Sequence, residues 1–242
     1  MFRQVLDGAH ERGLRVFMDL VVNHSSEEHP WFKESRKSKD SPYHDYYFWR
    51  PGRRGGINGK KLLPPNNWTS LFEGGAWEYD SNLDEFYLHL FAKKQPDLNM
   101  DNPAVREEVK KILRFWLDMG VDGFRLDAVK EYVTGSVEDN VEILSWFADY
   151  VHGKDPENYL VCECWTDQNT YAKYYESGVD SMFDFAFADK SGIIANVMNG
   201  KASATSYAKN LETEQGMYAQ YNPDYINAPF YTNHDMGRSA GY

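Results

Sequence analysis

The stretch from Asn102 to Asp127, NPAVREEVKKILRFWLDMGVDGFRLD, decides the fold class of this chain. Asn102 is a favourable helix cap and Pro103 suits a first helical turn, so they predict a helix that runs to Gly120. Residues 121–126 predict the strand that follows. A helix followed by a strand in this way is the repeating unit of an α/β fold with a parallel sheet.

The same alternation continues on both sides of this stretch. Residues 1–13 carry apolar side chains at helical spacing, and residues 14–22 form a nearly continuous apolar run, which is typical of a strand buried on both faces. Further strands are predicted at 159–164, 180–185 and 228–232. Helices are predicted between them, at about 137–152, 166–178 and 189–220.

Five strand–helix units resemble the middle of a (β/α)8 TIM barrel, about strands 3–7. Residues 25–97 interrupt the pattern because they are polar and rich in aromatic residues, Gly and Pro, with a predicted hairpin formed by 71–80 and 85–91. We therefore predict an incomplete barrel, residues 1–24 and 98–242, with 25–97 as an inserted subdomain after the third strand.

This reading implies that the early strands, the last strand and the native N-terminus are missing from the chain. Strands 14–22 and 228–232 would then be unpaired edges. We expect the isolated chain to be poorly soluble, oligomeric or weakly folded, and nearly inactive on starch.

The composition excludes several classes of function. A formal net charge of −11 disfavours nucleic acid as a partner, and no apolar run approaches the roughly 18 residues of a membrane span. Aromatic residues make up 16% of the chain, which suits a neutral sugar substrate. Cys162 and Cys164 lie two positions apart on one predicted strand, so we interpret them as small buried apolar residues. Compartment and oligomeric state stay open.

Polar and charged side chains stand at the end of four predicted strands. In a parallel barrel these ends meet on one face, so the side chains are expected to share a pocket. A group of carboxylates in an aromatic-lined site favours glycosidic cleavage, in which one carboxylate attacks and one acid protonates the leaving oxygen. The strand-end residues are Asp19, Asn23 and His24; Arg125 and Asp127; Glu163; and Asn233, His234 and Asp235.

These residues carry a family resemblance. DLVVNH (19–24), GFRLDAVK (123–130), the strand with Glu163 and FYTNHD (230–235) resemble the four signature segments of the α-amylase family of glycoside hydrolases. QPDLN (95–99) resembles a fifth segment of that family. The five segments occur in the family's order, and together they make the resemblance specific.

The resemblance implies a retaining mechanism with three acidic residues. Asp127 would be the nucleophile, Glu163 the general acid and then the general base, and Asp235 a group that binds sugar hydroxyls and favours a distorted ring. Arg125 would keep the nucleophile ionised and aligned. In a retaining pair the two working carboxyls lie roughly 5–5.5 Å apart, which is our expectation for Asp127 and Glu163.

The remaining signature residues would bind or support the sugar. The resemblance implies that His24 and His234 donate hydrogen bonds beside the scissile bond, with Asp19 and Asn233 supporting them. Lys130 matches a residue that contacts the leaving-side sugar, although Glu131 replaces the His that commonly follows it in α-amylases.

The chemistry itself requires no cofactor. Asn23 and Asp97 match positions that bind a structural Ca²⁺ in many α-amylases, and their oxygens suit a hard cation. Relatives of the α-glucosidase type keep similar residues without the ion, so both alternatives stay open.

The expected substrate is an α-glucan or oligosaccharide. Ala128 after the nucleophile and the short stretch between Asp127 and Glu163 resemble enzymes that cleave α-1,4 bonds in starch or maltodextrins. QPDLN and DLVVNHSSEEHPWF instead resemble the oligo-1,6-glucosidase and α-glucosidase branch, so α-1,6 cleavage or transglycosylation is the alternative. A non-catalytic relative is a third reading, disfavoured because such relatives typically lose members of the acidic trio.

Overall fold

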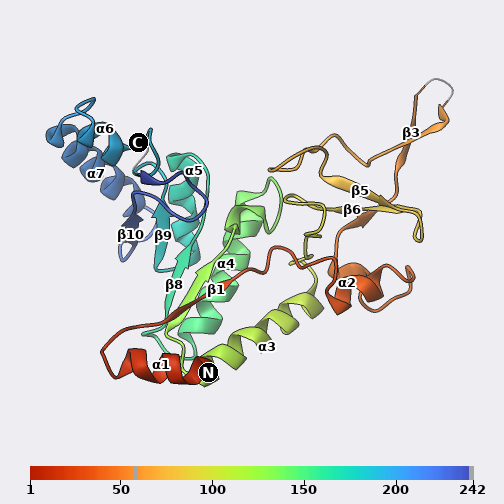
Figure 1. Ribbon diagram of the computed structural model, residues 1–242, viewed down its shortest axis with the longest axis horizontal. Coiled ribbons are helices and arrows are strands. Elements are labelled where there is room, and N and C mark those ends of the chain that lie inside the picture. Colours follow the sequence, from red (N-terminus) through yellow and green to blue (C-terminus); the bar gives the residue numbers. More distant parts are fainter. Residues whose placement is uncertain (57–58, 240–242) are drawn as a thin grey trace. The chain divides into compact units, whose positions relative to one another are not determined.

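A computed structural model describes residues 1–56 and 59–239 of the chain (Figure 1). The chain divides into two compact units. The first comprises Met1–Leu20 and Leu113–Tyr242, and the second comprises Val21–Ile112.

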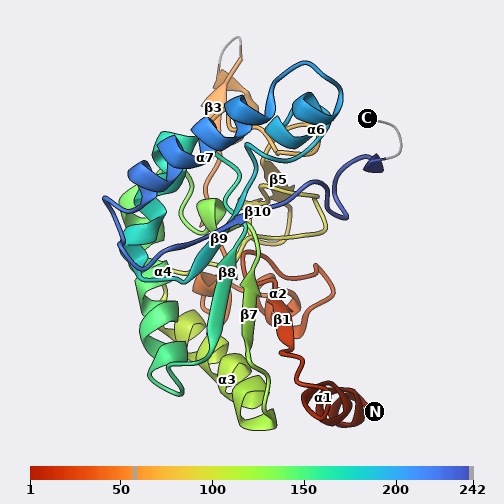
Figure 2. The same cartoon turned by 90° about the vertical axis from the view of Figure 1, so that its left-hand side faces the viewer.

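The first unit is built on a five-stranded parallel sheet with the order β1-β7-β8-β9-β10. Every neighbouring pair is parallel, which confirms the predicted α/β class. Figure 2 shows β1, β7, β8 and β9 side by side. The strands are β1 (Phe17–Leu20), β7 (Gly123–Leu126), β8 (Tyr159–Cys162), β9 (Ser181–Asp184) and β10 (Ile226–Pro229).

Helices connect the strands of this unit. Its α-helices are α1 (Phe2–His10), the C-terminal part of α3 (Pro103–Met119), α4 (Val137–His152), α5 (Gln168–Lys173), α6 (Ile193–Met198) and α7 (Ala204–Tyr218). Two 3-10 turns complete the set, η3 (Val129–Glu131) and η4 (Tyr174–Ser177).

The caps of the long helices follow from the sequence. The Asn102 side chain accepts a hydrogen bond from the backbone of Ala104 at 2.9 Å, as expected for the start of α3. Ser136 caps α4 by accepting from the Asp139 amide at 3.2 Å. The buried residues of α4 recur at helical spacing and pack one face of that helix into the core. They are Asn140, Ile143, Leu144, Phe147, Ala148 and Val151.

The contact between β7 and β8 depends on Gly123. A Cβ atom at this position would lie 1.9 Å from the carbonyl oxygen of Tyr159, and its φ of +149° is one that other residues rarely adopt. Glycine therefore allows β8 to approach β7 closely. Leu126 and Cys162, which face each other in the register, are both fully buried.

Several boundaries differ from the sequence-based prediction. The first strand is Phe17–Leu20 rather than 14–22, and of its four residues only Leu20 is buried, so the expectation of burial on both faces was wrong. The last strand is Ile226–Pro229 rather than 228–232, because its pairing starts where the Ile226 amide donates to Asp180 at 2.8 Å. Phe230 then leaves the sheet and packs edge-on against Phe185, with ring centroids 5.0 Å apart. The helix predicted over 189–220 is two helices, separated near Gly200, whose φ of +67° ends the first.

Among the described residues, β1 and β10 form the edges of the sheet, as predicted. Phe17 on β1 is 42% exposed and Ile226 on β10 is 49% exposed. Exposed apolar side chains of this size on an edge strand are a surface where another element would gain by packing.

The second unit holds two small antiparallel sheets. One has the order β2-β6-β5 and contains the predicted hairpin, and the other is the pair β3-β4. Phe32 is fully buried at its centre against Tyr47, Trp49 and Tyr87. The elements are α2 (Pro30–Ser35), η1 (His44–Tyr46), β2 (Trp49–Arg50), β3 (Arg53–Gly55), β4 (Lys61–Leu63), β5 (Trp77–Asp80), β6 (Glu85–Leu88) and the N-terminal part of α3.

Helix α2 and the pair β3-β4 are not predicted from the sequence, because they are short and lie among Gly and Pro residues. The subdomain boundaries 25 and 97 stay a prediction. Within the described residues, every helix is too short or too polar to cross a membrane.

Candidate active site

The site begins where β7 and β8 end side by side. Leu126 and Cys162 are partners in the parallel register, so the residues that follow them, Asp127 and Glu163, emerge at the same edge of the sheet. The backbone of Glu163 continues the pairing, because its amide donates to Leu126 at 2.9 Å and its carbonyl accepts from Val129 at 3.0 Å. The two carboxylates are therefore neighbours through backbone pairing rather than through side-chain chemistry alone.

Arg125 draws three carboxylates together. Its Nη1 atom donates to Asp19 at 2.9 Å and also to Asp127, and its Nη2 atom donates to Glu163 Oε2 at 2.7 Å. The Arg125 side chain is only 14% exposed, and those of Asp127 and Glu163 are similarly enclosed. Because Arg125 lies two residues before Asp127, both side chains point to the same face of the chain.

Burial and charge act on this cluster in opposite directions. Burial raises the pKa of Glu163, Arg125 opposes that rise, and the neighbouring Asp127 adds to it both by its charge and by a side-chain hydrogen bond. Burial lowers the pKa of Arg125, but the three carboxylates outweigh burial and the pKa is raised overall. Glu163 therefore keeps its proton to a higher pH than an ordinary glutamate does.

Ala128 stands between the carboxylates with a left-handed backbone, φ 48° and ψ 41°. Such a conformation costs about 1 kcal/mol or more for a residue with a Cβ, and residues held this way cluster at functional sites. The Ala128 amide lies 3.4 Å from Glu163 Oε2, so the strained turn aims a backbone donor at that carboxylate.

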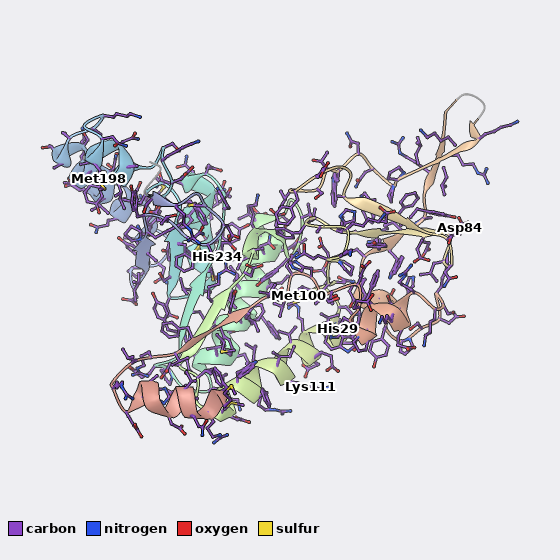
Figure 3. All side chains as sticks on the ribbon, in the orientation of Figure 1. His29, Asp84, Met100, Lys111, Met198 and His234 are labelled. Atoms are coloured by element: carbon purple, nitrogen blue, oxygen red, sulfur yellow. The ribbon has the colours of Figure 1, made fainter. Side chains whose placement is uncertain are left out.

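The third predicted carboxylate, Asp235, lies in the segment after β10 and lines a cavity of the first unit. Asp235 pairs with His234 at 3.1 Å, and its amide donates to the Asn233 side chain at 3.0 Å. Figure 3 labels His234 in this segment, which follows β10. Asp235 lines a cavity of about 530 Å³ together with Trp165, Asp189, Lys190, Met236, Gly237 and Arg238.

Trp165 is a residue of this cavity that the sequence analysis did not select. Its ring is stacked on Phe185, with centroids 4.6 Å apart and an interplanar angle of 17°. The Trp165 residue is nevertheless 55% exposed, so one face of the indole is open. Its position two residues after Glu163 was the available signal, because alternate residues of an extended segment share a face.

Tyr132 is a second residue near the site that the sequence did not indicate. It is 1% exposed, and its hydroxyl is buried with no hydrogen-bond partner among the described residues. Burial raises the pKa of Tyr132, with further contributions from Cys162 and Asp127, so the phenol stays neutral beneath the cluster.

Three predicted residues belong to the second unit. Asn23 and Asp97 are 1% and 2% exposed and lie on adjacent backbone segments, since the Leu98 amide donates to the Asn23 carbonyl at 2.8 Å. His24 contacts the Gln95 side chain at 2.8 Å. Asp97 accepts from the Leu90 amide at 3.1 Å, so one of its oxygens is already used.

The donors around Asn23 are few for a calcium site. Ca²⁺ takes six to eight oxygen ligands. Over residues 1–56 and 59–239, no group of three or more His, Cys, Asp or Glu side chains is placed to hold a metal ion. Asn23 and Asp97 could supply at most part of a coordination sphere.

Lys130 lies in η3 and pairs with Glu131 at 3.0 Å. This pairing holds the ammonium group against its own neighbour. Cys162 and Cys164 are both free thiols and fully buried, as predicted. Burial raises the pKa of Cys162, so that thiol is unreactive.

Comparison with known proteins places the chain in a family. All 242 residues match the family described as "Alpha amylase, catalytic domain". The chain is 61% identical to the oligo-1,6-glucosidase of Parageobacillus thermoglucosidasius over 128 residues, which are 53% of the chain and 22% of that protein. It is 38% identical to alpha-amylase 3 of Dictyoglomus thermophilum over 237 residues, which are 98% of the chain and 43% of that protein.

A solved structure agrees with this assignment. The structure titled Eubacterium rectale Amy13B superposes with a TM-score of 0.85 at 38% identity, over 99% of this chain and 45% of that one. The chain thus spans less than half the length of these relatives. From its sequence match over all 242 residues, this chain belongs to the alpha-amylase catalytic-domain family of glycoside hydrolases.

Proposed function

We propose that the protein carrying this chain hydrolyses α-glucosidic bonds of oligosaccharides or α-glucans with retention of configuration. The observation that carries the proposal is the single guanidinium of Arg125, which contacts Asp127 and Glu163 through its two Nη atoms. A retaining double displacement requires two carboxyl groups roughly 5–5.5 Å apart, and a shared guanidinium keeps Asp127 and Glu163 close together.

In the first step, a carboxylate oxygen of Asp127 attacks the anomeric carbon. The bond to the leaving oxygen breaks as Glu163 transfers its proton to that oxygen. In the second step, Glu163 takes a proton from water, the water oxygen attacks the anomeric carbon, and Asp127 is released. The raised pKa of Glu163 supports its role as the acid, and the contact between Arg125 and Asp127 supports a fixed position for the nucleophile.

The cavity lined by Asp235 and Trp165 supports a role of these two residues in sugar binding. Asp235 would accept hydrogen bonds from sugar hydroxyls, and the open face of Trp165 offers a stacking surface in the same cavity. His24 and His234 would donate to the sugar beside the scissile bond, with Asp19 and Asn233 in support. We further propose that β1, β7, β8, β9 and β10 correspond to strands 3–7 of the family's (β/α)8 barrel, with 25–97 as the inserted subdomain.

Two linkages compete for the preferred substrate. The small Ala128, whose amide faces Glu163, favours α-1,4 bonds of maltodextrins. The 61% identity to an oligo-1,6-glucosidase over 128 residues favours α-1,6 bonds of short isomaltooligosaccharides. Initial rates on maltotriose, starch and isomaltotriose, measured side by side, decide between them. A rate at least tenfold higher on isomaltotriose would reject the α-1,4 preference.

The mechanism is tested by the configuration of the first product and by one substitution. Proton NMR should show the α-anomer as the initial product, ahead of mutarotation. Asp127→Asn should lower kcat roughly 10⁴-fold or more, whereas Asp118→Asn, an exposed aspartate on α3, should leave it unchanged. An initial β-anomer, or a fully active Asp127→Asn protein, would overturn the proposal.

A structural Ca²⁺ held in part by Asn23 and Asp97 is a separate proposal. If it is right, a calcium chelator should lower the melting temperature, and added Ca²⁺ should restore it. Asn23→Ala should remove that calcium response. A melting temperature that ignores both chelator and calcium would reject the ion.

A further inference from the structure

A second pair of carboxyl groups lies inside the first unit, apart from the cluster on Arg125. Asp184 is the last residue of β9 and is 1% exposed. Glu214 lies on α7 and is 5% exposed. Figure 2 shows α7 running beside the β9–β10 side of the sheet. The mechanism proposed above uses neither residue.

Asp184 is fully engaged as an acceptor. Its Oδ2 atom accepts from the Asn227 side chain at 2.8 Å and from the Tyr218 hydroxyl at 3.0 Å. Its Oδ1 atom accepts from the Ala186 amide at 3.1 Å. These donors come from β10, from α7 and from the chain after β9, so one carboxylate joins three segments.

Glu214 is only half satisfied. Its Oε1 atom accepts from the side-chain amide of Gln168 on α5. Its Oε2 atom is buried and has no hydrogen-bond partner among the described residues. Gln168 also contacts the Tyr218 hydroxyl at 3.4 Å, and Tyr218 donates to Asp184, so both carboxyl groups belong to one buried hydrogen-bond network. A buried carboxylate oxygen without a donor costs desolvation energy, and the charge of Asp184 adds to that cost. A proton on Glu214 removes both costs, because the carboxyl group is then neutral and can donate to Asp184.

We propose that Asp184 and Glu214 share one proton, and that this shared proton ties α7 to β9 and β10. Through Asn227 the pair fixes β10, the strand whose C-terminal continuation carries Asp235. Asp184 and Glu214 are thus positioning residues, and their influence on activity rests on the function proposed above. Loss of the proton to solvent leaves two negative charges in one buried network and loosens α7 from the strands.

The titration of Glu214 supports this arrangement. Burial raises the pKa of Glu214 to about 7, the hydrogen bond from Gln168 opposes the rise, and the charge and hydrogen bond of Asp184 add to it. The titratable groups that face the pair from the surrounding elements are phenols whose pKa values burial also raises, so they stay neutral. They are Tyr171 on α5, Tyr175 on η4 and Tyr218 on α7.

The sign of the pH dependence follows. The pKa of Glu214 in the folded protein lies above its ordinary value of 4.5. The stability contributed by the proton on Glu214 is therefore fully present below pH 4.5 and is lost as the pH rises through about 7. Above that pH the strands β9 and β10 should open more readily.

Glu214→Gln separates this proposal from simple packing. The glutamine oxygen can still accept from Gln168, and its amide donates to Asp184 at every pH. The matched control is Glu212→Gln, an exposed glutamate on the same helix. We would measure backbone hydrogen exchange of the peptide spanning β10 at pH 5.5 and pH 8, corrected for the intrinsic rate, in the whole protein.

The expected result is equal protection of β10 in the wild type and Glu214→Gln at pH 5.5. At pH 8 the wild type should exchange at least tenfold faster than Glu214→Gln, because the pKa of Glu214 is raised from 4.5 to about 7 and a difference of one in pKa corresponds to a factor of ten. Glu212→Gln should follow the wild type. Equal exchange in wild type and Glu214→Gln at both pH values, or a destabilised Glu214→Gln at pH 5.5, would overturn the shared proton.

A second readout connects the pair to activity. At pH 8, Glu214→Gln should have a higher kcat than the wild type on the same oligosaccharide, and the difference should vanish at pH 5.5. If exchange changes as expected while the protein has no glycosidase activity, the shared proton stands and the proposed function fails. If activity is present but its ratio between the two proteins does not depend on pH, the positioning role fails.

Discussion

The Nη2 atom of Arg125 donates to Glu163 Oε2 at 2.7 Å, so the acid candidate and the cation are in direct contact. The same guanidinium holds Asp127 and Asp19 through Nη1. The planar fork of arginine can serve two carboxylates at once, whereas an ammonium group is a single point of charge. This relationship makes Arg125 the residue on which the geometry of the site depends.

Arg125→Lys should therefore cost activity although it keeps the positive charge. We expect kcat/KM to fall about 100- to 1000-fold, the range found when one preorganised donor is removed from an active site. Arg114→Lys, an exposed substitution on α3, is the control and should be neutral. Steady-state kinetics on one oligosaccharide checks both. A fully active Arg125→Lys protein would mean that charge alone suffices.

The pH profile should report the proton on Glu163. Its pKa is raised, chiefly by burial, so the protonated acid persists above its ordinary range and kcat/KM should fall as the pH rises through the raised value. Glu163→Gln, assayed on an aryl α-glucoside whose leaving group needs no proton, should lack that alkaline limb. If the limb persists in Glu163→Gln, another group provides the proton.

Trp165→Ala should weaken binding without changing the chemical step. Stacking on an aromatic ring contributes about 0.5–1.5 kcal/mol, which corresponds to a two- to tenfold increase in KM for oligosaccharides at unchanged kcat. Trp165→Phe retains a ring against Phe185 and should recover most of the affinity. A fall in kcat with constant KM would instead place Trp165 in the support of Glu163.

Gly123→Ala should destabilise the protein because the new Cβ meets the carbonyl oxygen of Tyr159 at 1.9 Å. We expect a loss of about 2–4 kcal/mol in the free energy of unfolding, measured by urea titration. Gly135→Ala is the matched control: its φ is also positive, at +83°, but nothing lies within 4 Å of its Cβ. It should cost only about 1 kcal/mol. Equal losses in the two variants would remove the close approach as the cause.

The sequence predicts the supersecondary pattern well because that pattern depends on local signals. The Asn102 cap and the buried runs before Asp127 and Glu163 are readable from neighbouring residues, and the five parallel strands follow from them. The strand boundaries were less accurate, as at Ile226–Pro229, because a strand ends where its partner's hydrogen bonds end. The residues of one strand do not show where its partner strand ends.

For the candidate site, the residues could be predicted from the sequence but their contacts could not. Asp19, Arg125, Asp127 and Glu163 could be chosen from the sequence because each stands at or near the end of a predicted strand. Their contacts through one guanidinium could not, since these depend on the register of β1, β7 and β8. Trp165 was missed because its value lies in the open face left when it stacks on Phe185, a residue twenty positions away in the chain.

By itself, the sequence determined which residues can do chemistry and which elements carry them, because caps, apolar periods and strand-end carboxylates are local properties. Only the tertiary structure decided which of these groups share charge and protons. The pKa of Glu163 depends on burial beside Asp127, and that of Glu214 on a strand, β9, thirty residues earlier in the chain. Desolvation and Coulomb interactions depend on distance in space, and that distance exists only in the folded chain.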